Sequence, residues 1–406
     1  MWAAYLALSG VDLSEKLVWF RSLGAYYALD LDGMSLVMVA LTAALTPTVL
    51  VAEWYVTSQR GSEGAKWSTK TFFALVLALE SLSLFVFLAA DVLLFYLFFE
   101  ATLIPMYFLI AGWGGPDRAK AAMKFLIYSL AGGLIMLVAV AGLYAVSADA
   151  GDPSYLVSDL AALNISGTTG QWLFVGFFIA FAIKAPMVPV HTWLPDTAQQ
   201  ATPGASTMLV GILDKIGTFG MVRFCLGIFP DASKWATPVV LGLALLSIIW
   251  GGLMAIGSKN LLRLIAYTSV SHFGFMVFGI FAMTSVSMNG SIFYMVNHGF
   301  STAALFLGVG FIIIRRGSAE ITDFGGVQKV APVLAGMFLV SGLSGLALPG
   351  MGSFVSEFMV MSGSWQRYPW LTAVATLGTV LAALYILLMY KRTMTGTAPK
   401  QVAERF

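Results

Sequence analysis

Apolar stretches long enough to cross a membrane recur along this chain from about residue 33 to residue 390. Hydrophobic residues make up 59% of the 406 residues, charged residues make up only 10%, and the mean hydropathy is +0.87. Soluble domains carry about 25% charged residues, so this chain has too few to solvate a globular surface. Runs of about 20 apolar residues are typical of transmembrane helices. The sequence therefore predicts an all-α polytopic membrane protein.

The composition also argues against several classes of function. A net charge of +2 does not indicate a nucleic-acid partner. The single Cys225 rules out a disulfide framework and any site that needs several cysteines. The chain has no GxGxxG, P-loop or HExxH motif. We therefore expect no cofactor and no metal in this chain. We also expect no cleavable signal, because residues 1–10, MWAAYLALSG, lack a basic stretch and a long apolar core.

Eleven membrane spans are expected. They cover residues 33–56, 70–90, 92–112, 119–147, 171–190, 204–228, 236–257, 261–284, 290–314, 331–362 and 369–390. Two of them contain helix breakers: Pro186 and Pro189 interrupt the fifth, and the glycine-rich segment SGLSGLALPGMGS (341–353) interrupts the tenth. The substantial loops are 1–32, 57–69, 148–170 and 315–330.

The distribution of basic residues predicts the orientation in the membrane. When alternate loops are assigned to opposite sides, fourteen of the 22 Lys and Arg residues fall on one side and four on the other. Cytoplasmic loops carry the excess of positive charge. Residues 1–32 are therefore expected on the periplasmic side and the tail, 393–406, in the cytoplasm of a bacterium, with the spans in its inner membrane.

The spans are arranged as a repeat. If the span at 33–56 is set aside as a peripheral helix, the other ten form two sets of five, at 70–228 and 236–392. The interrupted span is the fourth of each set. Because each set contains an odd number of spans, the two sets insert with opposite polarity, an architecture typical of ion-coupled transporters.

Titratable residues inside the spans predict a pathway for protons. A charge at the middle of a span costs about 2.5–3.5 kcal/mol on insertion scales, so such residues usually have a function. Burial favours the neutral forms of lysine and glutamate, and histidine titrates near neutral pH, so all three can exchange protons. The series along the chain, here called the relay residues, is Glu100, Lys184, Lys215, His272, His298 and Glu357.

Several of these residues also have a simpler structural interpretation. Glu100 and Lys184 are compatible with a structural ion pair. Lys215 is compatible with neutralisation by Asp214, although adjacent residues do not face each other on a helix. His272 follows the hydroxyl-rich segment YTSVS, which is able to hold it as a hydrogen-bonded core residue, and His298 has a similar alternative.

Three further residues are expected to have secondary roles. His191 lies in the proline-rich break and is expected to cap backbone groups rather than to carry protons. Lys124 lies one turn into its span, where snorkelling to the surface and a functional role are equally compatible with the sequence. Glu80 lies near a helix end and is expected to tune a neighbouring group.

Five segments closely resemble the antiporter-like subunits of respiratory complex I, and the M-type subunits of bacterial NADH–quinone oxidoreductase match best. The segments are FYLFFEATLIPMYFLIAGWGG (95–115), KAPMVPVHTWLPDTAQQATPGASTMLVGILDKIGTFG (184–220), LLRLIAYTSVSHFGF (261–275), NHGFSTAALF (297–306) and GMGSFVSEFMV (350–360). The similarity extends from about residue 28 to residue 392, and the HTWLPDT stretch is highly specific for this superfamily.

The resemblance implies a fold of fourteen helices with two inverted five-helix repeats. The eleven spans of this chain correspond to the third to thirteenth helices of the family. Glu100 then resembles the glutamate of the fifth helix, Lys184 its partner on the broken seventh, and Lys215 the central lysine of the eighth. His272 and His298 resemble the connecting histidines. Glu357 resembles the terminal acid of the broken twelfth helix, a position where L- and N-type subunits carry lysine. Glu80 resembles a secondary glutamate on the fourth helix.

The resemblance also implies the activity. A chain of this family translocates protons in the membrane arm of an NADH:quinone oxidoreductase. Flavin, iron–sulfur clusters and quinone belong to partner subunits, and the L-type and N-type subunits are expected neighbours, beside lipid, protons and water. The alternatives are a subunit of a multisubunit cation/proton antiporter or membrane-bound hydrogenase, and a scaffold that moves no protons.

Overall fold

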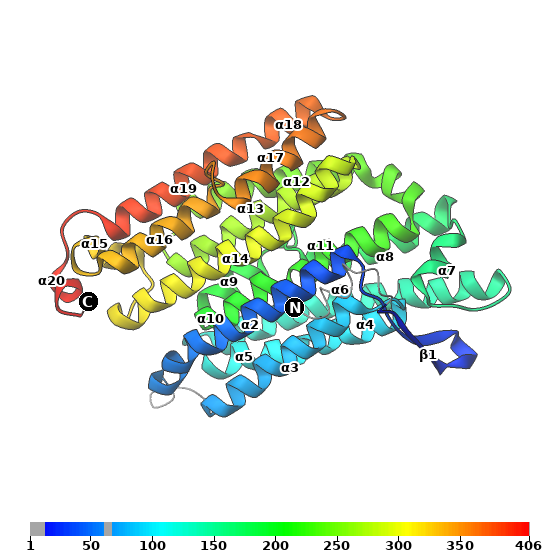
Figure 1. Cartoon of the computed structure of the whole chain (residues 1–406), viewed down its shortest axis with the longest axis horizontal. Coiled ribbons are helices and arrows are strands. Elements are labelled where there is room, and N and C mark those ends of the chain that lie inside the picture. The colour runs from blue at the N-terminus through cyan, green and yellow to red at the C-terminus, as the bar shows by residue number, and fades with distance from the viewer. Residues whose placement is uncertain (1–12, 61–66, 406) are drawn as a thin grey trace.

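Helices packed side by side account for most of the computed structural model, which describes residues 13–60 and 67–405 (Figure 1). The expectation about a signal concerns residues 1–10, which lie outside the described residues. The N-terminal loop contains one feature that an all-α prediction does not include. Residues Glu15–Phe20 (β1) and Ala25–Leu29 (β2) form an antiparallel hairpin joined by η1 (Arg21–Leu23). The hairpin and α7 (Val157–Ala162) lie at one end of the helix array, and α15 (Val327–Val330) and α20 (Lys400–Arg405) lie at the opposite end.

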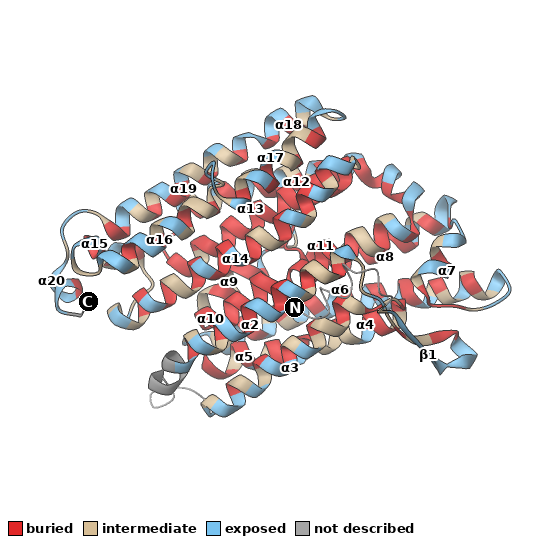
Figure 2. Ribbon diagram, in the orientation of Figure 1, coloured by how far each residue is buried: buried red, intermediate tan, exposed pale blue. Residues whose placement is uncertain are grey.

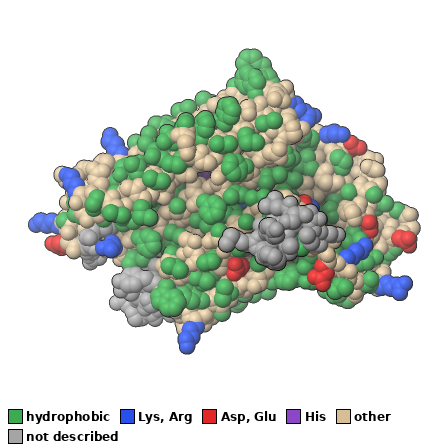
Figure 3. Space-filling view, in the orientation of Figure 1, with side chains coloured by type: hydrophobic (Ala, Val, Ile, Leu, Met, Phe, Trp, Pro, Cys, Tyr) green, Lys and Arg blue, Asp and Glu red, His purple; other side chains and the backbone are tan. Residues whose placement is uncertain are grey.

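Within the described residues, eight segments are long and apolar enough to cross a membrane. They are α2 (Gly33–Arg60), α3 (Thr69–Leu88), α4 (Val92–Ala101) with α5 (Leu103–Trp113), α6 (Arg118–Asp149), α12 (Pro230–Gly257), α13 (Leu261–Ala282), α14 (Ser285–Arg316), and α18 (Pro369–Ala375) with α19 (Leu377–Met394). These segments coincide with eight of the eleven expected spans. Hydrophobic side chains cover much of the visible surface, and charged side chains lie mostly towards its two ends, as lipid contact requires (Figure 3).

The other three expected spans are divided into short elements. The fifth becomes α8 (Gly167–Lys184) and the start of a non-helical segment at 185–192, and α9 (Trp193–Gln200) follows beyond the expected span. The tenth becomes α16 (Pro332–Gly345) and α17 (Gly352–Trp365), so both breaks fall where the sequence predicts them. The sixth was expected to be continuous. It consists of α10 (Pro203–Met208), η2 (Leu209–Leu213), α11 (Lys215–Gly220) and η3 (Met221–Leu226), and η2 and η3 are π-helical. π-Helical turns are rare and occur often at functional sites.

Helix α13 lies at the centre of the molecule. All residues in its most apolar stretch of 18 are buried, whereas only 33% are buried in the corresponding stretch of α3 (Figure 2). Glycines let α12 and α13 approach backbone to backbone: a Cβ at Gly251 would lie 2.7 Å from Ser271 N, and one at Gly274 would lie 2.8 Å from Ala244 O. Small residues of this kind favour close helix packing inside membranes. The central position of α13 places its histidine far from lipid.

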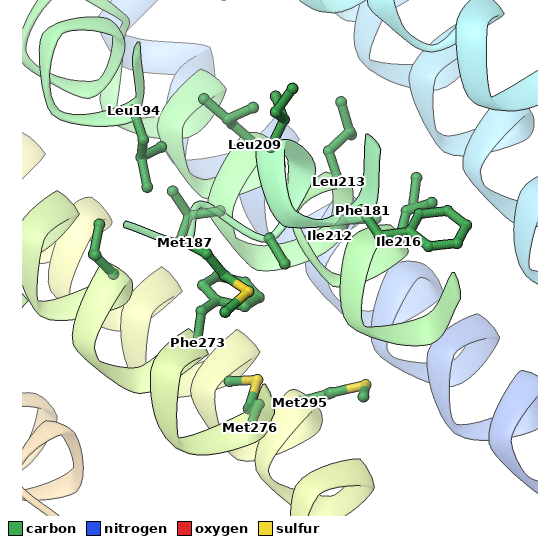
Figure 4. Packing of buried hydrophobic residues seen from close by; sticks show 14 of the residues in the cluster. Phe181, Met187, Leu194, Leu209, Ile212, Leu213, Ile216, Phe273, Met276 and Met295 are labelled. Atoms are coloured by element: carbon green, nitrogen blue, oxygen red, sulfur yellow. The ribbon is translucent and has the colours of Figure 1, made fainter. Parts of the chain in front are cut away.

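Protein groups satisfy the backbone at the break after α8. Ala185 N–H donates to Phe181 O (2.7 Å), Val188 N–H donates to Ser247 Oγ on α12 (2.9 Å), and Trp193 Nε1–H donates to Ile183 O (3.0 Å). Non-helical backbone at membrane depth is tolerated only where protein or water pairs with it. Figure 4 shows Met187 of this segment among buried apolar side chains from η2, α11 and α13. The first half of the break, residues 185–188, is therefore a packed part of the core.

Gly217 of α11 is the closest point of contact with the end of α8. A Cβ at Gly217 would lie 2.5 Å from Ala185 N and 2.6 Å from Phe181 O, so a side chain there collides with backbone. We expect Gly217→Val to cost about 3 kcal/mol or more and to reduce sharply the amount of folded chain in membranes, measured by immunoblotting. Gly242→Val on α12 is the matched control, because no atom lies within 4 Å of its Cβ position. Equal amounts of the two variants would contradict this account of the packing.

Candidate functional site

The six relay residues lie on six different elements. Glu100 is on α4, Lys184 on α8, Lys215 on α11, His272 on α13, His298 on α14 and Glu357 on α17. Glu100 is half-buried, and the other five are at most 5% exposed. Residues far apart in the sequence therefore meet inside the bundle, in the part that lipid does not reach.

Lys184 is the last residue of α8, and its ammonium lies between aromatic rings. Its Nζ is 5.3 Å from the centre of the Phe99 ring on α4 and 5.7 Å from that of Phe125 on α6. Contacts of this kind stabilise a cation without fixing it to one partner. In the part of the chain that the structure describes, Nζ has no hydrogen-bond partner.

Glu100 and Lys184 interact electrostatically but form no direct ion pair among the described residues. The Glu100 carboxyl lies against Gly133 of α6, where a Cβ would overlap it. A structural ion pair, which the sequence left open, is therefore not what this structure contains. The pair is called open here, because no hydrogen bond joins the two side chains.

Lys215 makes the shortest link in the site. Its Nζ donates to Val210 O (2.6 Å) and lies 2.8 Å from His298 Nδ1 on α14. The π-helical turn η2 ends two residues before Lys215 and contains this carbonyl. Lys215 and His298 therefore share a hydrogen bond along which a proton can be held by either side chain.

The line continues from His298 to Glu357 through aromatic side chains. The rings of His298 and His272 are 5.2 Å apart, and those of His272 and Tyr294 are 5.8 Å apart. Tyr294 Oη then donates to Glu357 Oε2 (3.4 Å). One oxygen of Glu357 and one nitrogen of each histidine have no hydrogen-bond partner among the described residues. Buried polar atoms without partners are uncommon and need an explanation, such as a role in chemistry.

The hydroxyls before His272 do not hold its ring. Thr268 and Ser269 donate to Ile265 O, and Ser271 donates to Ile248 O. The partner of His272 is Tyr385 on α19, with 3.1 Å between Nε2 and Oη. The ring is thus oriented by one hydroxyl from another helix.

Comparison with known proteins assigns the chain to a family. Residues 89–382 match the family described as NADH:quinone oxidoreductase/Mrp antiporter, transmembrane. NADH-quinone oxidoreductase subunit M of Mycobacterium tuberculosis is 47% identical over 410 residues, which cover 94% of this chain and 74% of that protein. The chain belongs to the M-subunit family of NADH-quinone oxidoreductase.

Solved structures agree with membership of the M-subunit family. A chain of respiratory complex I from Thermus thermophilus with bound NADH is 33% identical and superposes with a TM-score of 0.86, over 96% of this chain and 80% of that one. A chain of the Mrp complex from Dietzia sp. has the same TM-score at 24% identity, over 98% of this chain and 73% of that one. At that identity the second match shows a shared fold only. Because the two solved chains superpose equally well, sequence identity and not fold assigns this chain to the M-subunit family.

Three residues of this M-family chain that sequence reasoning missed also belong to the site. Tyr294 lies four residues before His298, on the same face of α14, and this spacing is a signal that could have found it. Tyr385 has no such signal, because 113 residues separate it from His272. Asp214 was considered only as a neutraliser of Lys215. It is fully buried, and neither of its carboxyl oxygens has a hydrogen-bond partner among the described residues.

The secondary residues lie away from this line. Glu80 is half-buried on α3 and faces Thr46 of α2. His191 lies in the break beside the Tyr267 ring (6.3 Å), and its backbone carbonyl accepts from Leu194 N–H. Backbone capping by the His191 side chain stays a prediction. Lys124 neither snorkels freely nor joins the line, because it forms an ion pair.

The partner of Lys124 is Asp196 on α9, which lies beyond the break. Asp196 accepts from Lys124 Nζ (2.6 Å) and from Arg263 Nη1 of α13 (2.5 Å). A cavity of about 270 Å³, lined in part by Asp196 and Lys124, opens beside this cluster. Burial raises the pKa of Asp196, but the hydrogen bonds from Lys124 and Arg263 outweigh it and hold that pKa below the ordinary value. The cluster joins α6, α9 and α13 at one end of the bundle.

We expect this cluster to stabilise the chain most at neutral pH. A carboxyl with a lowered pKa contributes stability above the pKa of the unfolded chain, about 4, and loses it as pH falls through the folded value. Asp196→Asn should therefore lower thermal stability by about 1 kcal/mol near neutral pH, and the difference should shrink in acid. Melting of the purified complex at several pH values checks this. The control is Asp231→Asn, whose exposed ion pair with Lys234 should contribute less to stability. A loss of stability in Asp196→Asn that does not change with pH would contradict the role of the cluster.

Proposed function

We propose that this M-family subunit moves protons across the membrane along the relay residues, driven by electron transfer in other subunits. The observation that carries the proposal is the line of neighbouring side chains from Lys215 through His298 and His272 to Tyr294 and Glu357. It is buried throughout, and its members lie on α11, α14, α13 and α17. Groups that change protonation state within reach of one another are what proton transfer inside a membrane requires.

The open Glu100–Lys184 pair is the element that couples this line to distant electron transfer. When the two side chains meet, the carboxylate stabilises the charged lysine. When they part, the buried ammonium loses that stabilisation and releases its proton more readily. A change in charge elsewhere in the membrane arm that favours one arrangement thereby changes the proton affinity of Lys184. Glu357 receives the proton at the far end of the line and passes it outward or to a neighbouring subunit.

We infer that the architecture follows the transporter pattern. Counting the three interrupted spans gives eleven in all, with a peripheral helix at 33–56 and inverted repeats at 70–228 and 236–392. The matching breaks after α8 and after α16 support this division. We propose further that residues 1–32 face the periplasm and that the tail, 393–406, faces the cytoplasm of a bacterium, with the spans in its inner membrane.

The subunit is proposed to work inside an NADH:quinone oxidoreductase. Its neighbours would be L-type and N-type subunits, and flavin, iron–sulfur clusters and quinone would be held by other chains. The 33% identity to a chain of respiratory complex I supports this assignment. Two alternatives to this assignment make different predictions. A cation/proton antiporter or a hydrogenase has the same fold in its membrane subunits, and a scaffold would hold the arm together without moving protons.

Two measurements test the proposal. Purification of the complex through this chain should yield NADH-oxidising peripheral subunits; their absence from an otherwise intact complex would favour the antiporter or hydrogenase. Proton uptake by vesicles containing assembled Glu100→Ala or Lys184→Ala complex should fall to the background of the assay. A scaffold predicts unchanged uptake in both variants, and that result would overturn the proposal.

A further inference from the structure

Asp214 is a buried acid that the relay line does not use. It lies between the π-helical turn η2 and α11, has no exposed surface, and neither carboxyl oxygen has a hydrogen-bond partner among the described residues. Its backbone is ordered: Asp214 N–H donates to Leu209 O (3.0 Å) and its carbonyl accepts from Gly217 N–H (3.1 Å). A buried carboxyl without partners is costly. A residue of this kind in a membrane core needs a functional explanation.

Packing brings Asp214 close to the end of α8. Gly217, three residues further on, lies so close to Ala185 and Phe181 that only a glycine fits. The start of α11 is thereby held against the residue that follows Lys184. Because Gly217 has no Cβ, the segment that begins at Asp214 packs against the end of α8, which carries Lys184.

The charges around Asp214 come from both relay lysines. Lys184 directly precedes Ala185, and the segment that begins at Asp214 packs against Ala185 through Gly217. Lys215 is adjacent in sequence, but its ammonium is turned to Val210 O and His298. Neighbouring residues on a helix point in different directions, so the Asp214 carboxyl remains available to Lys184. Asp214 therefore directly precedes Lys215, the start of the line, in a segment that packs against the end of α8.

We propose that Asp214 carries protons between Lys184 and Lys215, an inference that rests on the proposed function. When Lys184 parts from Glu100, its ammonium gives a proton to Asp214: an Nζ–H bond breaks, an Oδ–H bond forms, and both groups become neutral. The acid then gives the proton to the neutral amine of Lys215, which becomes an ammonium, and the carboxylate is restored. Charge is conserved in both steps, and no oxidant or reductant takes part.

A fixed counter-ion is the structural alternative. A carboxylate that only balances charge normally keeps its hydrogen bonds and a steady ion pair. Asp214 has neither with Lys184, Lys215 or any other described residue. An amide in its place keeps the shape of the side chain but cannot accept and release a proton, so Asp214→Asn separates the two roles when assembly is measured beside pumping.

The experiment compares proton uptake by vesicles containing the intact complex. Asp214→Asn should lower the rate of quinone-coupled uptake by about 10²-fold, to the background of the assay, whereas Asp214→Glu, which keeps the carboxyl, should restore most of it. The assembled amount and NADH oxidation with a water-soluble acceptor should not change in either variant. The control is Asp231→Asn, which removes an exposed carboxylate of the same chain and should pump normally.

Lys215→Met in the same assay distinguishes the two proposals. If Asp214→Asn pumps normally while Lys215→Met does not, the role of Asp214 is wrong and the proposed function stands. If both variants pump normally, the proposed function fails as well. If the Asp214→Asn complex does not assemble, Asp214→Glu decides: pumping by the assembled Glu variant supports the role, and loss of pumping contradicts it.

Discussion

Lys184→Arg is expected to stop proton translocation by the assembled complex, although the substitution keeps the positive charge. Arginine stays protonated at all accessible pH values, so it cannot take part in a cycle of proton gain and loss. Lys184 is 1% exposed and its ammonium lies between the Phe99 and Phe125 rings, so bulk water does not replace it as a proton carrier. Removal of a positioned proton-transfer group slows transfer by about 10²-fold or more. Proton uptake by vesicles after addition of NADH and quinone measures the effect.

Two companion variants show whether charge or proton exchange is lost. Lys184→Met removes both and should be as inactive as Lys184→Arg. Lys234→Arg changes an exposed lysine near the start of α12, 63% of whose side chain is accessible, and should pump normally. NADH oxidation by a water-soluble acceptor does not depend on the membrane arm and should stay the same throughout. Normal pumping by Lys184→Arg would remove Lys184 from the relay, because a permanently charged group would then be sufficient.

Lys215→Met should have an effect at least as large, because Lys215 is the start of the line and its only member that hydrogen-bonds to His298 among the described residues. The substitution keeps the length of the side chain and its apolar stem but removes the hydrogen bond to His298 (2.8 Å) and the donor to Val210 O (2.6 Å). His298, His272 and Glu357 would remain in place without a proton supply from the α8 side. We expect quinone-coupled proton uptake to fall by about 10²-fold in complexes that assemble normally.

A double substitution tests whether Lys215 and His298 form one link. Residues that act as a unit are not additive, so Lys215→Met with His298→Ala should be no worse than either change alone. His191→Ala is the control, since that histidine lies in the break and does not contact the line. If the losses from Lys215→Met and His298→Ala multiply, the two residues serve separate paths, and the line drawn from Lys215 to Glu357 is wrong.

Sequence reasoning succeeded where a property is local. Hydropathy over about 20 residues depends on the segment alone, so the eight long spans coincide with expectation. Proline and glycine act on their own backbone, so both predicted breaks, after Lys184 and before Gly352, are present. Buried charge is costly in any lipid environment, and this principle, with the near-neutral titration of histidine, selected the six relay residues inside spans, whose role stays a prediction.

Contacts between distant segments could not be predicted in this way. The π-helical turns of the sixth span depend on how it packs against its neighbours, and no residue pattern in 204–228 signals them. Lys124 has a basic side chain near a helix end, for which snorkelling was a reasonable expectation. Its ion pair exists because the break turns α9 so that Asp196 faces α6 and α13.

By itself, the sequence determined that this chain spans a membrane many times, where its helices break, and which titratable side chains lie inside the spans. Tertiary structure alone decided the order in which those side chains meet. His272 is oriented by Tyr385 from 113 residues away, Glu357 is reached through Tyr294, and Gly217 lets the segment that begins at Asp214 pack against the end of α8. The physical reason is that hydropathy and helix breaking are set by neighbours along the chain. Proton transfer depends instead on separations of a few ångströms between helices, and only the packing of the whole bundle sets these.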